Sequence, residues 1–423
     1  MPTVQVFIYD VCIQLYRLGI FIASPFSSKA KRWLLGRDKL FPRLGKNITS
    51  IHGKKIWIHC ASLGEFEQAR PLIEKLKQLN PEHKIILTFF SPSGYDVRKY
   101  FDLADYVSYL PLDTAENARK FIGMMKPSIV IWVKYEYWYH FLNHLQVKNI
   151  PVVLISAIIR EEHVFFKWYG ALHRRMLGFF THIFVQNEES KKLLQSINIA
   201  SEVCPDTRFD RVVDITQQRK QYDNIAKFKG DKKLFIAGST WAKDNKLICR
   251  LINNDPFAKN FKYIIAPHNV TEGNINYLTD TINWRSGLFS RITTQNADEI
   301  DVMIVDGIGA LSSLYYYADI AYVGGGFGAS VHNILEPAVY GMPVIFGPNH
   351  LKSAEAVEML SHKDWHAAYS ISGYKELYST IASLLDNEEA ALKTGSQRSK
   401  EYVLAHTGGT DQIYSWLKDK KLI

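Results

Sequence analysis

Three charged residues have catalytic potential: Glu65 and Glu136 follow apolar segments of the chain, and Arg208 lies near the expected domain junction. Glu65 stands in CASLGEFEQ, Glu136 in VKYEYW and Arg208 in DTRFD. A carboxylate at the carboxyl end of a strand can act as a general base or hold a sugar hydroxyl, and arginine binds carboxylates and phosphates through paired hydrogen bonds. Simpler roles remain open: a capping-box acid for Glu65, a solvated strand-end acid for Glu136, and an ion pair with a neighbouring aspartate for Arg208.

A second set of candidate residues lies in YVGGGFGASVHNILEP, where three glycines follow an apolar run. We expect a helix to begin near His332–Asn333, with Glu336 in its first turn. The N-terminus of such a helix can receive a phosphate, and Glu336 can accept hydrogen bonds from ribose hydroxyls. The alternative is a glycine-rich turn with a capping acid. Neither GxGxxG nor GxxxxGK[ST] occurs in this stretch, which disfavours a dinucleotide fingerprint and a P-loop.

Two further strand ends offer groups to a ligand. AGSTWAKD combines an apolar segment, a small-residue turn and a helical pattern, so its backbone N–H groups could meet a phosphate. APHN places His268 beside Pro267 at the end of another apolar segment. A lone histidine is more often structural than catalytic, and that interpretation stays open here.

Short apolar segments that alternate with helical patterns supply the scaffold for these residues. Such alternation predicts parallel strands with helices between them. The expected strands are 55–61, 84–90, 106–113, 128–136, 150–157 and 182–189, then 232–240, 261–269, 301–307, 318–326 and 342–349, with another at 366–372 in a mostly helical C-terminal region. This alternation of strands and helices is weaker through residues 210–230, which separates two runs of β-α units. We therefore expect an α/β protein of two doubly wound domains that face each other across a cleft.

The domain boundaries follow from the same pattern. We expect a membrane-associated helix at 1–27, an N-terminal Rossmann-like domain at 28–214 and a C-terminal Rossmann-like domain at 215–423. The last helix of the chain can return to the N-terminal domain.

Composition restricts the class of protein. The 423 residues are 47% hydrophobic and 22% charged, which excludes global disorder. The formal net charge of +9 indicates acidic or phosphorylated partners. Four cysteines without a CxxC pair disfavour a disulfide scaffold and a cysteine-rich zinc site. Reduced thiols in a cytosolic setting fit best.

The first fifty residues carry much of the positive charge, with eight basic residues against two acidic ones. The apolar stretch before this basic cluster is interrupted by Asp10, Gln14 and Arg17, which a helix would place on one stripe. This pattern favours an amphipathic or marginal membrane helix followed by a basic patch on the cytoplasmic side. A buried helix docked on the body of the protein is the alternative.

Taken together, the glycine-rich turn, H-N-x-x-E-P and P-V-I-F-G-P resemble the nucleotide half of GT-B glycosyltransferases. With S-L-G-E upstream, the chain is similar to the Kdo (3-deoxy-D-manno-octulosonic acid) transferase family, from the N-terminal anchor to about residue 405. The resemblance implies a GT-B fold and an inverting transfer of Kdo from CMP-Kdo to a lipid A precursor, lipid IVA, in lipopolysaccharide core biosynthesis. It places the catalytic domains on the cytoplasmic face of the inner membrane. We expect no cofactor and no metal.

The resemblance also assigns residue roles. Glu65 corresponds to the catalytic base and Glu136 to a second acid, and Arg208 stands where the family usually has lysine. The positions matched to the CMP site are Pro267, His268, Ile308, Gly309, Ala310, Asn333, Ile334, Leu335 and Glu336. His268 replaces the family's arginine, which weakens the expected phosphate contact.

Other functions remain open at this stage. One is a different GT-B sugar-nucleotide transferase or an epimerase, with UDP-sugars as substrates. Another, of a different class, is a basic membrane-attached binding module. Because no aromatic and basic residues interleave as in single-strand binders, we expect no nucleic-acid partner. The expected partners are the CMP-Kdo donor, the lipid A precursor acceptor and an anionic membrane surface.

Overall fold

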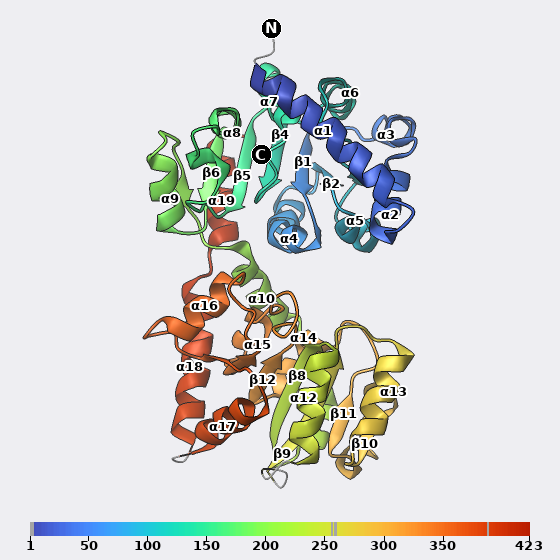
Figure 1. The fold of residues 1–423 in the computed structure, drawn as a ribbon, viewed down its shortest axis with the longest axis vertical. Coiled ribbons are helices and arrows are strands. Elements are labelled where there is room, and N and C mark those ends of the chain that lie inside the picture. The colour runs from blue at the N-terminus through green and yellow to red at the C-terminus, as the bar shows by residue number, and fades with distance from the viewer. Residues whose placement is uncertain (1–3, 255–256, 258–259, 387–388) are drawn as a thin grey trace. The chain divides into compact units, whose positions relative to one another are not determined.

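A computed structural model describes residues 4–254, 257, 260–386 and 389–423, so the first three residues of the expected 1–27 helix lie outside the described residues. The chain divides into two compact units (Figure 1). Unit 1 comprises Met1–Arg211 and Thr407–Ile423, and unit 2 comprises Val212–His406.

Unit 1 is built on a parallel sheet that has seven strands in the described part of the chain, in the order β3-β2-β1-β4-β5-β6-β7. Ile56 in β1 pairs with Ile85 in β2 on one side and with Ile129 in β4 on the other. The central strands are buried on both faces, as in a sheet covered by helices on each side. The strands are β1 (Lys55–Cys60), β2 (Lys84–Phe89), β3 (Tyr106–Tyr109), β4 (Ile129–Val133), β5 (Val152–Ala157), β6 (His182–Val185) and β7 (Glu202–Val203).

Helices connect these strands, and the last helix of the chain also belongs to unit 1. Ile413 and Leu417 of that helix are buried in the same core as Phe66 and Leu72 of α4. The helices are α1 (Val4–Ala23), α2 (Ser28–Arg37), α3 (Leu40–Ile48), α4 (Leu63–Leu79), α5 (Pro92–Arg98), α6 (Ala115–Met125), α7 (Tyr139–Val147), α8 (Ala171–Leu177), α9 (Glu188–Gln195) and α19 (Gly409–Asp419), with the 3-10 turn η1 (Val164–Phe166). Helix α10 (Thr207–Gln217) begins in unit 1 and ends in unit 2.

Helix α1 is docked on unit 1 along one stripe. Val6 and Ile13 are buried, and the Tyr9 hydroxyl donates a 2.6 Å hydrogen bond to Asp113. Asp10 pairs with the imidazole of His140 at 2.5 Å. The opposite stripe of this helix is apolar and exposed, and by length and composition α1 could cross a membrane. The two alternatives considered for this segment therefore each describe one face of the same helix.

Unit 2 is built on a second parallel sheet, also with seven strands among the described residues, in the order β10-β11-β9-β8-β12-β13-β14. Its strands are β8 (Lys233–Thr240), β9 (Phe261–Pro267), β10 (Ser286–Leu288), β11 (Val302–Ile304), β12 (Ile320–Val323), β13 (Val344–Phe346) and β14 (Ala368–Ser370). Its helices are α11 (Asp223–Lys229), α12 (Ala242–Asn253), α13 (Glu272–Thr281), α14 (Leu311–Leu314), α15 (Leu335–Ala338), α16 (Ala354–Ser361), α17 (Tyr374–Leu385) and α18 (Ala390–Ala405), with the 3-10 turns η2 (Phe289–Arg291), η3 (Ala297–Glu299) and η4 (Tyr315–Tyr317).

The expected α/β class and its two sets of parallel strands are confirmed. Two short strands, β7 and β10, were not predicted, because two or three residues carry no periodic pattern. The helix expected to begin near His332–Asn333 begins at Leu335, and Glu336 lies in its first turn as predicted. Helix α15 makes only a single turn, so its dipole is small.

Candidate active site

Glu65, Glu136 and the glycine-rich turn lie at points where strand order reverses. In unit 1, β1 and β4 are neighbours although two strands separate them in sequence, and β8 and β12 stand in the same relation in unit 2. In open α/β sheets, ligands bind beyond the carboxyl ends of the strands at such switch points. Glu65 follows β1 and Glu136 follows β4, whereas Trp241 follows β8 and the three glycines follow β12.

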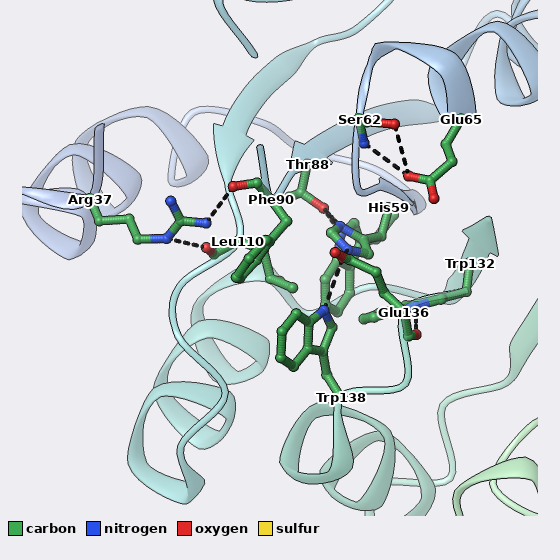
Figure 2. A network of polar contacts seen from close by, with 11 residues as sticks. Arg37, His59, Ser62, Glu65, Thr88, Phe90, Leu110, Trp132, Glu136 and Trp138 are labelled. Atoms are coloured by element: carbon green, nitrogen blue, oxygen red, sulfur yellow. Dashed lines mark hydrogen bonds and ion pairs between the residues drawn. The ribbon is translucent and has the colours of Figure 1, made fainter. Parts of the chain in front are cut away.

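Glu65 is held at the start of α4 by the predicted capping box. The backbone N–H of Ser62 donates to its Oε2 at 2.9 Å (Figure 2). Burial, and then the negative charge of Glu136, raise the pKa of Glu65 from 4.5 to about 7, although the Ser62 hydrogen bond opposes them. The capping role and a proton-transfer role are therefore compatible in one side chain, since the cap orients a carboxyl group that titrates near neutral pH.

Glu136 is fixed by a chain of hydrogen bonds that starts inside the sheet. The indole N–H of Trp57 donates to Thr88 Oγ1 at 2.8 Å, and this oxygen lies 2.8 Å from His59 Nδ1. His59 Nε2 lies 2.8 Å from Glu136 Oε2.

The donor pattern of this chain follows from its two ends. The Glu136 carboxylate can only accept, so His59 Nε2 donates to it, and the indole N–H of Trp138 donates to the same oxygen at 3.0 Å (Figure 2). The Trp57 indole can only donate, which leaves the Thr88 hydroxyl proton to bond His59 Nδ1. Two donors thus converge on one oxygen of a mostly buried carboxylate, which fixes its position.

Arg208 forms an ion pair with Asp206, the neighbouring aspartate that the sequence offered as a partner. Its guanidinium lies 2.9 Å from Asp206, whose carboxylate also accepts hydrogen bonds from the side chains of Gln68 and Gln186. Burial alone would raise the pKa of Asp206, but the charge and hydrogen bonds of Arg208 outweigh burial and lower it. Asp206 thereby anchors Arg208. The pKa of Tyr135 is raised chiefly by burial, with smaller effects of nearby charges that include Glu65 and Arg208.

In unit 2, Asp244 organises the glycine-rich loop. Its carboxylate accepts hydrogen bonds from the Tyr322 hydroxyl at 2.5 Å, the Gly325 N–H at 3.0 Å and the Trp241 N–H at 2.8 Å. Gly325 has a φ of +94°, a conformation that favours glycine. The loop after β12 is therefore tied to the first turn of α12, because one buried carboxylate serves both.

Three aromatic rings stack at the carboxyl ends of β8, β9 and β12. The ring centroids of Trp241 and His268 are 4.6 Å apart, and those of His268 and His332 are 4.4 Å apart with planes 12° from parallel. Burial lowers the pKa of both histidines, so both are neutral at pH 7. His268 therefore has no positive charge for a phosphate, but offers a ring face and a hydrogen-bonding nitrogen.

The other residues predicted to bind the nucleotide differ in their exposure to solvent. Ile308 and Gly309 are exposed, whereas the side chains of Ile334 and Leu335 are fully buried. Asn333 is exposed, and its amide N–H donates to Glu336 at 3.1 Å while its oxygen accepts from the Leu335 N–H. Pro267 and Ala310 are buried. Within residues 333–336, the side chains of Asn333 and Glu336 are therefore the ones accessible to a ligand.

Sequence reasoning missed His59, Thr88 and Asp244. His59 and Thr88 lie inside apolar strands, where their neighbours predict only core positions. Asp244 carried a usable signal, since it stands at the third position of a helix that directly follows a small-residue turn. The stack of Trp241 with two histidines joins residues far apart in sequence, which spacing alone does not reveal.

Comparison with solved structures defines the class of fold. A crystal structure of UDP-GlcNAc 2-epimerase from Neisseria meningitidis bound to UDP-GlcNAc superposes with a TM-score of 0.59 at 16% identity, covering 86% of this chain and all of that one. At this identity the similarity concerns the fold alone. The two doubly wound sheets are those of the GT-B class.

Comparison with known sequences shows which family this chain resembles. Residues 38–211 match the family described as 3-Deoxy-D-manno-octulosonic-acid transferase (kdotransferase). A 3-deoxy-D-manno-octulosonic acid transferase of Haemophilus influenzae is 27% identical over 403 residues, which cover 90% of this chain and 91% of that relative. A bifunctional glycosyltransferase/methyltransferase of Fusobacterium nucleatum is 24% identical over 89% of this chain, but the chain spans only 59% of its length. The chain is therefore similar to Kdo transferases over most of its length, and residues 38–211 match the model of that family.

Proposed function

We propose that this protein transfers Kdo from CMP-Kdo to a glucosamine hydroxyl of a lipid A precursor, with inversion at the anomeric carbon and with Glu65 as general base. Similarity to the Kdo transferase family supports a glycosyltransferase reaction in lipopolysaccharide biosynthesis. The donor, the acceptor and the base are the parts that the proposal adds.

The observation that carries the proposal is the state of Glu65. A general base works best when its pKa lies near the operating pH, because it is then ionised and still accepts a proton readily. Burial and the charge of Glu136 bring the pKa of Glu65 to about 7, and the capping box holds the carboxylate in one orientation. An ordinary surface glutamate would be a much weaker base.

In the proposed reaction, Glu65 takes the proton from the acceptor hydroxyl as its oxygen attacks the anomeric carbon of Kdo. The bond from this carbon to the CMP phosphate breaks, and its electrons leave with CMP. This direct displacement resembles the inverting logic of glycosidases, in which no glycosyl-enzyme forms. Glu136, fixed by His59 and Trp138, serves as a second acid that positions the acceptor.

Unit 2 carries the residues proposed for the CMP moiety. The exposed members of that set are His268, Ile308, Gly309 and Asn333, with Glu336 partly exposed. Because His268 is neutral at pH 7, we propose that it contacts the nucleotide by hydrogen bonding and stacking. We assign to Arg208 the stabilisation of the negative charge that develops on the leaving phosphate. Its guanidinium keeps its positive charge in the ion pair with Asp206.

We further propose that α1 holds the protein on the cytoplasmic face of the inner membrane. The stripe of α1 that faces unit 1 is tied down by Tyr9, Asp10 and Ile13, so the helix is better suited to lie on the membrane surface than to cross it. Lipid acceptors would then meet the protein without leaving the bilayer.

The test is to incubate the purified protein with CMP-Kdo and a tetraacylated lipid A precursor and to weigh the product. We expect the mass of the acceptor to rise by one or more Kdo units and CMP to be released, whereas UDP-GlcNAc offered in parallel stays unchanged. Conversion of the UDP-sugar without Kdo transfer would instead assign the protein to the epimerases or another GT-B activity.

Variants of two neighbouring glutamates test the base. Glu65→Gln should lower kcat at least a thousandfold while CMP binding persists. Glu67→Gln is the matched control, because Glu67 lies on the same helix but pairs with Arg98. Near-normal transfer by Glu65→Gln would show that another group accepts the proton.

A further inference from the structure

A cavity of about 460 Å³ lies in unit 1 between the N-terminal helices and the strand ends that carry Glu136. Its wall includes Tyr16 and Ile20 from α1, and Lys29 and Trp33 from α2. Phe90, Trp138 and Glu136 lie on the sheet side. Its size and its mixture of aromatic and polar groups are typical of a site for a small polar ligand.

The aromatic residues of this cavity form one continuous surface around Phe90. The Phe90 ring centroid lies 4.7 Å from that of Trp138, 5.7 Å from that of Trp33 and 6.2 Å from that of Tyr16. Flat apolar faces of this kind pack against the C–H face of a sugar ring. They equally tolerate a lipid tail, so the polar groups decide between these occupants.

Trp33 contributes its ring to the wall of this cavity. The side chain is only 6% exposed, and its indole nitrogen is buried without a hydrogen-bond partner in the part of the chain that the structure describes. Because that nitrogen is closed off from solvent, the choice between a sugar and a lipid tail depends on the charged groups.

The charged groups at this cavity have opposite signs. The Glu136 side chain is 17% exposed and can accept hydrogen bonds from hydroxyl or ammonium groups. Lys29 is exposed in the first turn of α2 and forms no ion pair with any described residue. One carboxylate and one free ammonium together suit a ligand that combines an amino sugar with a phosphate.

We propose that this cavity is the subsite for the phosphorylated glucosamine head group of the lipid acceptor, with Glu136 facing its sugar hydroxyls and Lys29 its phosphate. The assignment rests on the proposed function, which makes a lipid A precursor the acceptor. It adds a place for the head group and names Tyr16, Lys29 and Trp33 as acceptor-recognition residues.

Helix α1 then has two roles on its two faces. Tyr16 and Ile20 line the cavity, while Phe7, Leu18 and Phe21 of the same helix are 64%, 51% and 65% exposed. If the exposed face lies in the membrane surface, a head group in the cavity is one helix diameter from the acyl layer. The acyl tails of the acceptor can thus stay in lipid while its sugar enters the protein.

Binding to a water-soluble probe tests the subsite without the transfer reaction. The probe is a deacylated glucosamine disaccharide bisphosphate, titrated into the full chain by calorimetry, with the unphosphorylated disaccharide and decanoate titrated in parallel. We expect the bisphosphate to bind most tightly. Preferential binding of decanoate would make the cavity an acyl-chain site and overturn the proposal.

Two lysines of α2 provide a matched pair of variants. Lys29→Glu should weaken binding of the bisphosphate at least tenfold and leave the unphosphorylated disaccharide unaffected, because only the phosphate contact reverses sign. Lys31→Glu makes the same change on the same helix at an exposed position that does not line the cavity, and should leave both affinities unchanged. Equal effects of the two variants would show that only general electrostatic attraction is at work, and the subsite would be rejected.

In transfer assays, Lys29→Glu should raise KM for the acceptor while KM for CMP-Kdo stays constant. If the wild-type chain binds the bisphosphate but transfers no Kdo, the proposed function fails and the binding site stands.

Discussion

Glu65 and Glu136 follow neighbouring strands, and the negative charge of Glu136 disfavours ionisation of Glu65. For Glu65 this repulsion adds to the effect of burial and raises its pKa to about 7. We predict that kcat/KM rises with pH on an acid limb centred near 7. Glu136→Gln removes a negative charge and should move this limb to lower pH, whatever it does to the maximal rate. A limb that stays in place would mean that Glu65 is not the titrating base.

The same ionisation affects folding. Because the folded-state pKa of Glu65 exceeds its ordinary value of 4.5, its contribution to stability is fully present below pH 4.5 and is lost as the pH rises through about 7. Since a pKa difference of one corresponds to about 1.4 kcal/mol, Glu65→Gln should raise the free energy of unfolding at pH 8 by about 1 to 3 kcal/mol. At pH 4 the variant and the parent should unfold at nearly the same urea concentration. A variant that is less stable at pH 8 would indicate that the capping interaction outweighs the ionisation cost.

Among the elements, strands that are buried on both faces were the most predictable. Runs such as KIWIHC and IVIWV are apolar without alternation, and this pattern already indicates a covered parallel sheet. The segment from Gly325 to Asn333 was not predictable in the same way. Asp244 and Asn349 hold this loop through hydrogen bonds to Gly325, Gly326 and Gly328, so distant residues decide where α15 begins.

The residues of the candidate site also differ in how far the sequence alone predicts their roles. Glu65 and Glu136 follow strand ends, and Arg208 stands in the first turn of α10, so residue type and position together indicate chemistry. His59 and Thr88 fix Glu136 from inside the sheet, and a polar residue within an apolar strand gives no indication of its partner. Local pattern therefore indicates where chemistry can occur, and tertiary structure determines which side chains support it.

The glycine-rich loop depends on a close approach of two backbones. A Cβ atom on Gly326 would lie 2.6 Å from the backbone nitrogen of Gly347, which cannot move aside as a flexible side chain could. We predict that Gly326→Ala lowers the free energy of unfolding by about 1 to 3 kcal/mol through overpacking, measured by urea denaturation.

Gly273→Ala is the matched control for this prediction. A Cβ atom there meets nothing within 4 Å, and Gly273 lies in helix α13, so alanine should be neutral or stabilise by up to about 1 kcal/mol. If both variants lose stability equally, the contact between Gly326 and Gly347 does not constrain the loop.

At the scale of the whole molecule, charge and apolar surface are concentrated at the N-terminus. Eight of the first fifty residues are basic and two are acidic, next to a helix whose outer stripe is exposed and apolar. Anionic lipid attracts basic residues by about 1 kcal/mol each near the surface, and buried apolar side chains add about 1.5 to 3 kcal/mol each. We predict that the full chain binds phosphatidylglycerol vesicles in a sedimentation assay and that added salt weakens this binding.

A pair of leucines separates membrane contact from general surface hydrophobicity. Leu18→Ser removes an apolar side chain from the outer stripe of α1 and should lower vesicle binding about tenfold, since the helix would insert this residue into the acyl boundary. Leu351→Ser makes the same change at an exposed position of unit 2 and should leave binding unchanged. Because Leu18 does not line the cavity beneath α1, its loss should also leave the affinity for the deacylated bisphosphate intact. Equal binding of the two variants to vesicles would show that the outer stripe of α1 does not enter the membrane, and the acceptor would then have to reach the protein by another route.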